Sequence, residues 1–301
     1  MGNIDDSLLA QLNESQREAV TYCDGPQLVI AGAGSGKTRV LTYKIAYLLD
    51  RYDMAPWNIL ALTFTNKAAR EMKERIGRLV GQDRAIRLQM GTFHSVFARI
   101  LRAEAEHIGF TSNFTIYDQS DSRSLVKSII KEMQLDDKTY KAASVADRIS
   151  MAKNHLLLPA QYATSSWAAD DAQHKRPMVS HIYNRYAERC RQANAMDFDD
   201  LLVQTYVLLK QHEEIRQKYV ERFQYVLVDE YQDTNFAQQA IVLLLTKEHG
   251  NKVIRINLMQ VSMTLGTYLG LYIILAYAFT LLSVKFSALS AVAMILMLGI
   301  P

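Results

Sequence analysis

Short apolar runs alternate with amphipathic stretches along the first 118 residues. Residues 27–31 (QLVIA) and 59–64 (ILALTF) are almost entirely apolar, and each run leads into a stretch with helical spacing. Uninterrupted apolar runs of this length are typical of parallel strands that are buried on both faces. The alternation of such strands with helices predicts an α/β domain with a parallel sheet.

The pattern changes over residues 119–196, where no strand-like run occurs and the spacing is helical throughout. We predict a helical insertion subdomain there, with residues 164–177 (TSSWAADDAQHKRP) as a loop inside it. A helix over 198–211 (FDDLLVQTYVLLKQ) and a buried strand at 225–230 (YVLVDE) then restore the first pattern. The predicted sheet domain therefore comprises residues 1–118 and 197–250.

The end of the chain has a different character. Residues 256–284 form 29 consecutive positions without a charged side chain, which exceeds the ~20 apolar residues that cross a bilayer. Three interpretations remain open: a membrane anchor with Lys252 and Arg255 on the cytoplasmic side, a strand and helix that complete the fold, or an out-of-frame or rearranged end. We treat residues 251–301 as an aberrant hydrophobic tail outside the domain pattern.

The net charge of +3 arises in this tail. Of the 34 basic residues, three follow residue 251 with no acidic residue beside them, which leaves 31 basic against 31 acidic residues before it. The charge is therefore no evidence for nucleic-acid binding, which has to be argued from motifs. The two cysteines are far apart, and the N-terminus lacks the pattern of a signal peptide, so we expect a cytoplasmic protein.

A glycine-rich turn lies between the first strand and its helix, in residues 28–40 (LVIAGAGSGKTRV). Its glycines allow backbone N–H groups to converge on phosphate oxygens at a helix N-terminus. Lys37 is placed to reach the β- and γ-phosphates, and the Thr38 hydroxyl to hold Mg²⁺. Ala31 stands where the strict pattern has glycine. The combination favours a nucleotide site over a plain turn.

Two carboxylates end the later strand, in residues 226–233 (VLVDEYQD). Strand ends at the carboxyl edge of a parallel sheet are where ligands bind in open α/β folds. Asp229 is suited to hold Mg²⁺, and Glu230 to orient and deprotonate an attacking water. Adjacent acids at a strand end are often solvated turn residues, but the earlier glycine-rich turn favours the catalytic interpretation.

Six motifs follow one another along the chain: residues 12–20 (LNESQREAV), 31–38 (AGAGSGKT), 61–72 (ALTFTNKAAREM), 91–95 (GTFHS), 196–202 (MDFDDLL) and 228–235 (VDEYQDTN). In order and spacing they resemble the N-terminal half of the UvrD/PcrA/Rep helicases of superfamily 1, over about residues 8–250. The resemblance implies a RecA-like P-loop NTPase that uses ATP and Mg²⁺. It also implies 3′ to 5′ translocation along single-stranded DNA and unwinding at duplex junctions.

The resemblance assigns nucleotide contacts to Gln16, Ala31, Gly32, Ala33, Gly34, Ser35, Gly36, Lys37, Thr38 and Arg39. It makes Lys37, Asp229, Glu230 and Gln232 catalytic, with Thr38 and Asp229 as metal ligands. Gln16 is similar to a glutamine that reads adenine, because its amide offers a donor and an acceptor. Asn13 and Gln16 also have the spacing of a capping box, and Arg39 is also explained as a surface charge.

Contacts with single-stranded DNA are implied for Thr63, Phe64, Thr65, Asn66, Thr92, His94 and Phe198. Aromatic side chains stack on bases with little sequence preference, which suits a translocating motor. Phe64 has an equally plain interpretation as strand core, and a lone histidine such as His94 is more often structural. Asp197, Asp199 and Asp200 suggest a metal site, but acids that open a helix more often cap it.

After residue 250 the family pattern is expected to continue with a γ-phosphate-sensing motif and a second RecA-like domain. Residues 250–254 (GNKVI) begin the required strand, but neither feature follows. We therefore expect an N-terminal helicase fragment that does not unwind DNA alone. The alternative is a non-enzymatic module that binds nucleotide and DNA, either membrane-tethered or defunct. The motifs DEYQD and TFTNKAA disfavour other P-loop enzymes, such as kinases, and the protein partners are unknown from the sequence.

Overall fold

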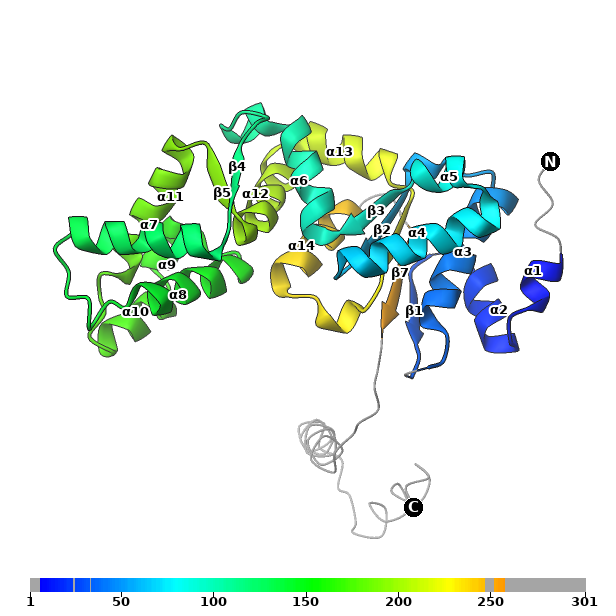
Figure 1. Cartoon of the computed structure of the whole chain (residues 1–301), viewed down its shortest axis with the longest axis horizontal. Coiled ribbons are helices and arrows are strands. Elements are labelled where there is room, and N and C mark those ends of the chain that lie inside the picture. Colours follow the sequence, from blue (N-terminus) through cyan, green and yellow to red (C-terminus); the bar gives the residue numbers. More distant parts are fainter. Residues whose placement is uncertain (1–5, 24, 33, 247–251, 258–301) are drawn as a thin grey trace, which may run out of the picture. The chain divides into compact units, whose positions relative to one another are not determined.

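A parallel five-stranded sheet organises the chain, whose computed structural model describes residues 6–23, 25–32, 34–246 and 252–257 (Figure 1). The strand order is β1-β7-β6-β2-β3, and every neighbouring pair is parallel. The strands are β1 (Gln27–Ile30), β2 (Ile59–Thr63), β3 (Gln89–Thr92), β6 (Tyr225–Val228) and β7 (Lys252–Asn257). The predicted α/β class with a parallel sheet is confirmed.

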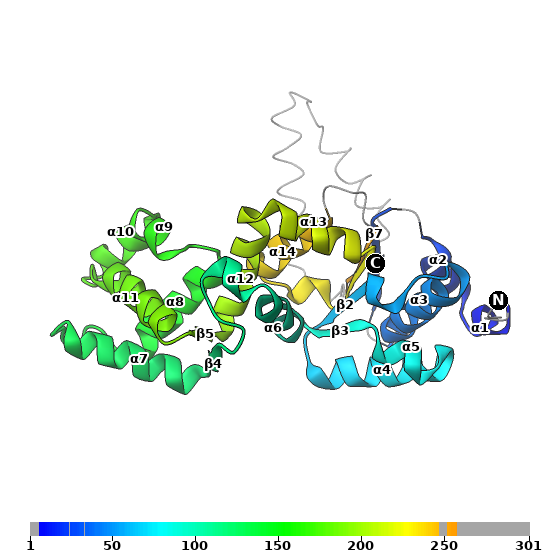
Figure 2. The same ribbon diagram turned by 90° about the horizontal axis from the view of Figure 1, so that it is seen from above.

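Helices cover both faces of this sheet (Figure 2). Successive strand residues point to opposite faces, so Leu60 and Val226 join one apolar core while Ala61 and Leu227 join the other. The first core is closed by α6 (Phe93–Ala103), α12 (Phe198–Gln211), α13 (Glu213–Arg222) and α14 (Phe236–Thr246). The second is closed by α1 (Asp6–Ala10), α2 (Glu14–Thr21), α3 (Lys37–Arg51), α4 (Asn66–Val80) and α5 (Gln82–Ile86).

Short 3₁₀ turns complete this part of the chain: η1 (Pro56–Asn58), η2 (Ala105–Ile108) and η3 (Tyr231–Asp233). The helix predicted over 198–211 is confirmed as α12, and the buried strand predicted at 59–64 is confirmed as β2. Both were predictable because the apolar spacing alone identifies an element that packs against a core.

The first strand differs from its prediction. Residues 27–31 were expected to be buried on both faces, but Leu28 is 53% and Ile30 59% exposed, and only Val29 packs against a core. Among the described residues β1 pairs with β7 alone, at the edge of the sheet. One face of an edge strand is readily left open, so an apolar run does not by itself establish burial on both faces.

The sheet also extends beyond the predicted boundary at residue 250. β7 lies between β1 and β6, which confirms the strand expected to begin at 250–254 and carries it to Asn257. Ile256 and Asn257, the first residues of the uncharged segment, therefore belong to a strand. The rest of the segment lies outside the described residues. Within the described ranges, no helix has the length and apolar character needed to cross a bilayer.

Residues 119–192 form five helices with an apolar core of their own. The helices are α7 (Gln119–Glu132), α8 (Ala142–Asn154), α9 (Pro159–Ala163), α10 (Ser166–Gln173) and α11 (Val179–Gln192). The chain enters this helical cluster through β4 (Thr115–Tyr117) and leaves through β5 (Ala195–Asp197), and the two short strands pair in parallel.

The loop predicted at 164–177 is wrong for its middle, which forms α10. The Ser165 hydroxyl accepts a hydrogen bond from the Trp167 amide at 3.2 Å and so starts the helix. Two aspartates, Asp170 and Asp171, then pair with Arg148 of α8 at 2.8 and 3.2 Å. The polar composition resembled a loop because the partner that stabilises these acids lies some twenty residues earlier in the sequence.

Candidate nucleotide and DNA site at the carboxyl edge of the sheet

Four sequence motifs meet at one edge of the sheet because each follows a parallel strand. The glycine-rich turn follows β1, the residues from Phe64 onward follow β2, α6 follows β3, and Asp229 and Glu230 follow β6. The backbone N–H of Asp229 donates to the Leu62 carbonyl at 2.9 Å, which holds the acidic pair against the end of β2. This edge is where ligands bind in open parallel sheets.

The glycine-rich turn has the backbone that its sequence predicted. Gly34 and Gly36 adopt φ values of +76° and +85°, which side-chain-bearing residues rarely adopt. Gly36 is the N-cap residue of α3, so the helix begins at Lys37, and Thr38 lies in its first turn. The Lys37 ammonium donates to the Gly32 carbonyl at 3.3 Å, inside the turn. Ala33 lies outside the described residues.

Gln16 connects the first helices to this turn. Its backbone N–H donates to Asn13 Oδ1 at 2.8 Å, and its Oε1 accepts from the backbone N–H of Asn13 at 3.2 Å, which confirms the capping box. Its Nε2 donates to the Ser35 carbonyl at 2.8 Å. A Cβ on Gly36 would approach that nitrogen to 2.9 Å, so the glycine gives Gln16 its room. Adenine contact remains a prediction.

Arg39 lies on the exposed side of α3. Its guanidinium carbon is 5.4 Å from the centre of the Tyr43 ring, one helical turn further along. The structure thus shows Arg39 over a helix surface, as the simpler interpretation expected, and a nucleotide contact by this side chain remains a prediction.

The acidic pair at the end of β6 is electrostatically strained. Burial, and then the neighbouring charge of Glu230, raise the pKa of Asp229 to about 6, while the Lys37 ammonium opposes the rise. Glu230 has a φ of +52°, an uncommon backbone for a residue other than glycine and one that tends to occur at functional sites. The Gln232 amide donates to Glu230 Oε2 at 2.7 Å and so orients this carboxylate.

The residues after β2 are divided between core and surface. Thr63 is buried, and Phe64 packs partly against the core with its ring 5.7 Å from that of Phe93. Thr65 Oγ1 accepts from the Ala68 amide at 3.1 Å and caps α4, while Asn66 is exposed at the first position of that helix. Phe64 is therefore half-buried and retains an open face.

His94 and Phe198, which are far apart in the sequence, meet where α6 and α12 begin. Their ring centres are 5.3 Å apart, and Phe198 is 55% exposed. Burial lowers the pKa of His94, opposed by the charge of Asp199. The neighbouring Thr92 Oγ1 accepts from the Ser95 amide at 3.2 Å and caps α6. The structure thus brings three of the predicted DNA contacts together.

The UvrD/REP helicase N-terminal domain family matches residues 12–261. The chain belongs to this family. It is 46% identical over 245 residues to the ATP-dependent DNA helicase PcrA of Staphylococcus aureus, covering 81% of this chain and 33% of that protein. It is 45% identical over 251 residues to PcrA of Bacillus subtilis, covering 83% and 33%, and 44% identical over 246 residues to PcrA of Leuconostoc citreum, covering 82% and 32%.

The chain spans about a third of the length of the curated relatives it matches. The UvrD/REP match runs through β7 to residue 261 and so includes the strand that begins at 250–254. In the sheet β7 is an inner strand, paired with β1 on one side and with β6 on the other.

This UvrD/REP domain contains a buried lysine that the sequence did not indicate. Lys153 of α8 is 2% exposed, and its ammonium lies 2.6 Å from Asp197 Oδ2 and 2.7 Å from Asp200 Oδ1. Asp197 and Asp200 also form the capping box of α12, which confirms their predicted role as cap residues. The Tyr186 hydroxyl donates to Asp197 at 2.7 Å and completes the group.

The charges in this group depend on one another. Burial disfavours the ammonium of Lys153, but Asp197 and Asp200 outweigh it and raise its pKa well above the ordinary value. Burial and the charge of Asp197 raise the pKa of Asp200 to about 6. Nothing in the local sequence distinguishes Lys153 from the surface lysines of the helical cluster, because its partners lie on another element.

A cleft of about 370 Å³ opens beside this group. Its walls come from the start of α7, from α8 and from the start of α12, and include Tyr117, Arg123, Ser150 and Phe198. The exposed Phe198 ring therefore borders a concave surface that the helical cluster and the sheet domain share.

Proposed function

We propose that this chain is the ATP-binding, RecA-like domain of a superfamily 1 helicase. In this proposal residues 1–118 and 197–257 form the motor domain, and residues 119–196 form a helical insertion subdomain. The observation that carries the proposal is the meeting of the glycine-rich turn with the acidic pair at one sheet edge, where the Lys37 charge acts on Asp229. Similarity to PcrA proteins, which are named ATP-dependent DNA helicases, supports it.

The residues fit a nucleotide bound with Mg²⁺. A Cβ at Gly32 or Gly34 would meet nothing within 4 Å, so the turn is open to a ligand. Contacts with the phosphates are proposed for the backbone of Ala31, Gly32, Gly34, Ser35 and Gly36. Lys37 is proposed to bind the β- and γ-phosphates. The Thr38 hydroxyl and Asp229 would hold Mg²⁺, which neutralises phosphate charge when bound. A cation beside Asp229 would also favour the charged carboxylate and so oppose the rise in its pKa that burial causes.

Glu230 is proposed as the residue that accepts a proton from the attacking water. Its carboxylate is directed by the Gln232 amide and by the left-handed backbone at this position. Gln16 is proposed to contact adenine. Its hydrogen bond to the Ser35 carbonyl would link that contact to the glycine-rich turn when nucleotide is bound.

Single-stranded DNA is proposed to run along the same edge of the sheet. Contacts with its backbone are proposed for Thr63, Thr65, Asn66, Thr92 and His94, and stacking on its bases for Phe64 and Phe198. The exposed Phe198 ring, next to His94 and the cleft, supports stacking, which contributes roughly 1–3 kcal/mol per base. Translocation 3′ to 5′ and unwinding of duplex junctions are proposed for the whole helicase, with a second motor domain that closes on the nucleotide.

Phosphate release by the 301-residue chain with Mg·ATP, with and without single-stranded DNA, tests the proposal. We expect fluorescent ATP to bind, and any DNA-stimulated hydrolysis to disappear in Lys37→Ala and in Glu230→Gln. Glu230→Gln should still bind ATP, because Lys37 and the turn are intact. Nucleotide binding without turnover in the unmodified chain would favour a non-enzymatic binding module. Absence of nucleotide binding would overturn the proposal.

A further inference from the structure

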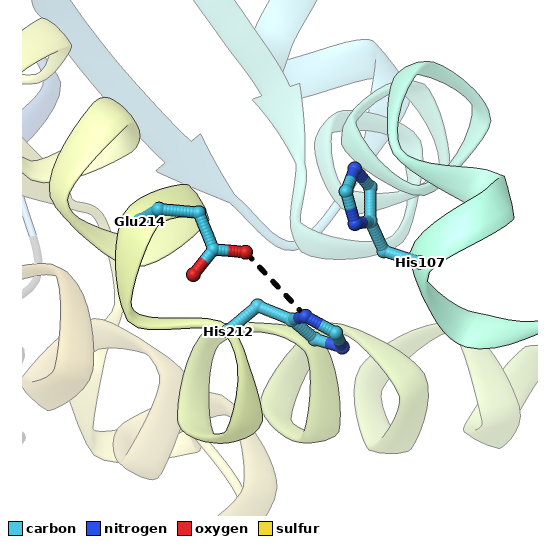
Figure 3. Close-up of side chains that lie close together, drawn as sticks. All are labelled: His107, His212 and Glu214. Carbon is cyan, nitrogen blue, oxygen red and sulfur yellow. Dashed lines mark ion pairs between the residues drawn. The ribbon is translucent and has the colours of Figure 1, made fainter.

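Three potential metal ligands meet on the side of the sheet domain where η2 contacts the junction of α12 and α13 (Figure 3). His107 belongs to η2, His212 follows the last residue of α12, and Glu214 lies in the first turn of α13. One ligand atom from each lies within 4.8 Å of the other two. The nucleotide motifs include none of these three residues.

The separations approach those of a metal centre. Zinc binds imidazole nitrogen and carboxylate oxygen at about 2.0–2.2 Å in a tetrahedral site, so its ligand atoms are about 3.4 Å apart. His212 Nδ1 and Glu214 Oε1 already lie 3.5 Å apart. The other separations, at most 4.8 Å, need a movement of little more than about 1 Å to reach that spacing. The His107 side chain is 47% exposed, so it has room to rotate.

A fixed carboxylate lies behind the outer histidine. Glu104 Oε2 is 4.0 Å from His107 Nε2, and Glu104 Oε1 accepts from Lys218 at 2.6 Å and from Tyr219 at 2.8 Å. A histidine that binds metal commonly donates its second ring nitrogen to such a carboxylate, which orients the ring.

We propose that His107, His212 and Glu214 bind one divalent ion of the zinc type, with water in the remaining position. Two imidazoles and one carboxylate suit zinc or a neighbouring transition metal, whereas Mg²⁺ prefers oxygen ligands alone. The site is exposed to solvent on the Glu214 side, where that side chain is 69% exposed, so an ion can enter without unfolding.

The bound ion would join two helices that begin at the proposed DNA contacts. α6 starts beside His94 and leads through Ala103 toward η2, while α12 starts at Phe198 and ends at Gln211 beside His212. At about 1.5 Å per residue, these helices place the metal roughly 20 Å from the ring pair of His94 and Phe198. The ion would therefore connect η2, which follows α6, to the C-terminal end of α12, outside the nucleotide site.

Metal binding is tested on the chelator-treated 301-residue chain, without nucleotide, Mg²⁺ or DNA. We expect one equivalent of Zn²⁺ to bind, and Co²⁺ to give the visible absorption of a tetrahedral site. The dissociation constant for Zn²⁺ should rise at least tenfold in His107→Ala and His212→Ala, and less in Glu214→Gln. His174→Ala, which removes an exposed histidine of the helical cluster, should leave Zn²⁺ binding unchanged.

Far-UV circular dichroism of the metal-free variants checks that they fold, which we expect because His107 and Glu214 are exposed. Zn²⁺ affinity that is the same in His107→Ala and His212→Ala as in the unmodified chain would overturn the site. So would the lack of any Zn²⁺ binding by the folded chain. Because no nucleotide is present, neither result depends on the proposed ATP site.

Discussion

Asp229 illustrates the conflict between stability and function at the scale of one residue. The residue is 6% exposed, and its pKa of about 6 lies above the ~3.9 of an unfolded aspartate. Between these two values the folded chain binds more protons than the unfolded chain does. The free energy of unfolding therefore falls as the pH rises from about 4 to about 6, and the loss persists at neutral pH.

We predict that Asp229→Asn stabilises the fold at pH 7 by about 2 kcal/mol, because the neutral amide removes a buried charge. The gain should vanish below about pH 3, where the aspartate is protonated in both states. Urea unfolding of the two proteins across this pH range measures the difference. A variant that is less stable at pH 7, or a gain independent of pH, contradicts the assignment. Hydrolysis should be lost in either case, because Asp229 is the proposed Mg²⁺ ligand.

Gln16 combines two contacts that a pair of substitutions separates. Gln16→Glu keeps the oxygen that accepts from Asn13 but removes the donor to the Ser35 carbonyl, whereas Gln16→Ala removes both. We predict that Gln16→Ala loses about 0.5–1 kcal/mol of stability, as expected for one lost hydrogen bond of the capping box, and that Gln16→Glu loses less.

Both Gln16 variants should bind fluorescent ATP more weakly. The comparison of thermal unfolding with ATP titration distinguishes the two roles. If Gln16→Glu binds ATP as tightly as the unmodified chain does, the contact with Ser35 has no part in nucleotide binding.

At the scale of elements, the Lys153 group joins the helical cluster to the sheet domain. The lysine comes from α8, the two acids from the start of α12, and all three are held by short ion pairs. Asn154 extends the junction, since its amide donates to Asp199 at 3.0 Å. The position of Phe198, which lies between these acids in the sequence, therefore depends on a residue of the helical cluster.

We predict that Lys153→Met destabilises the chain by about 3–5 kcal/mol at pH 7.5, because two buried carboxylates lose their partner. The loss should be smaller at pH 5, where Asp200 takes up a proton. Urea unfolding at both pH values tests this. Lys127→Met, at an exposed position of α7, should change stability by less than about 0.5 kcal/mol. Equal losses in the two variants would show that the buried pairs contribute nothing.

The sequence predicted those elements whose own residues determine them. β2 and α12 follow from apolar spacing, and the glycine-rich turn follows from glycines at positions that adopt positive φ. The capping boxes at Asn13 and Asp197 were also local and therefore foreseeable.

Features that depend on distant partners were missed. The polar sequence of α10 suggested a loop, because the partner of its acids, Arg148, lies on another helix. The charge of Lys153 is likewise balanced by residues on another element. The exposure of Leu28 and Ile30 depends on which strand lies next to β1, which no local pattern reveals. The contact between His94 and Phe198 likewise arises only when α6 and α12 pack together.

At the scale of the whole molecule, the sheet should not be uniformly stable. β2 and β6 are buried throughout, whereas β1 lies at the edge with two exposed apolar side chains. We predict that amide hydrogens of β1 exchange faster than those of β2 and β6, because fewer buried contacts oppose local opening.

Hydrogen exchange followed by mass spectrometry measures this order of protection. Saturating Mg·ATP should slow exchange in β1 and the glycine-rich turn, and Lys37→Ala should abolish that protection while leaving β2 unchanged. Equal protection of β1 and β2 without nucleotide would contradict the edge position of β1.

The place of β7 has a consequence for how the chain is made. Residues 27–30 pair with residues 254–257, so the strand that leads into the glycine-rich turn has a partner that is synthesised more than 220 residues later. At about 5–20 residues per second, translation of that interval takes roughly 10–45 s. The glycine-rich turn is thus synthesised long before β7, the strand with which β1 pairs. We therefore expect the proposed ATP site to form only once the chain has grown past Asn257.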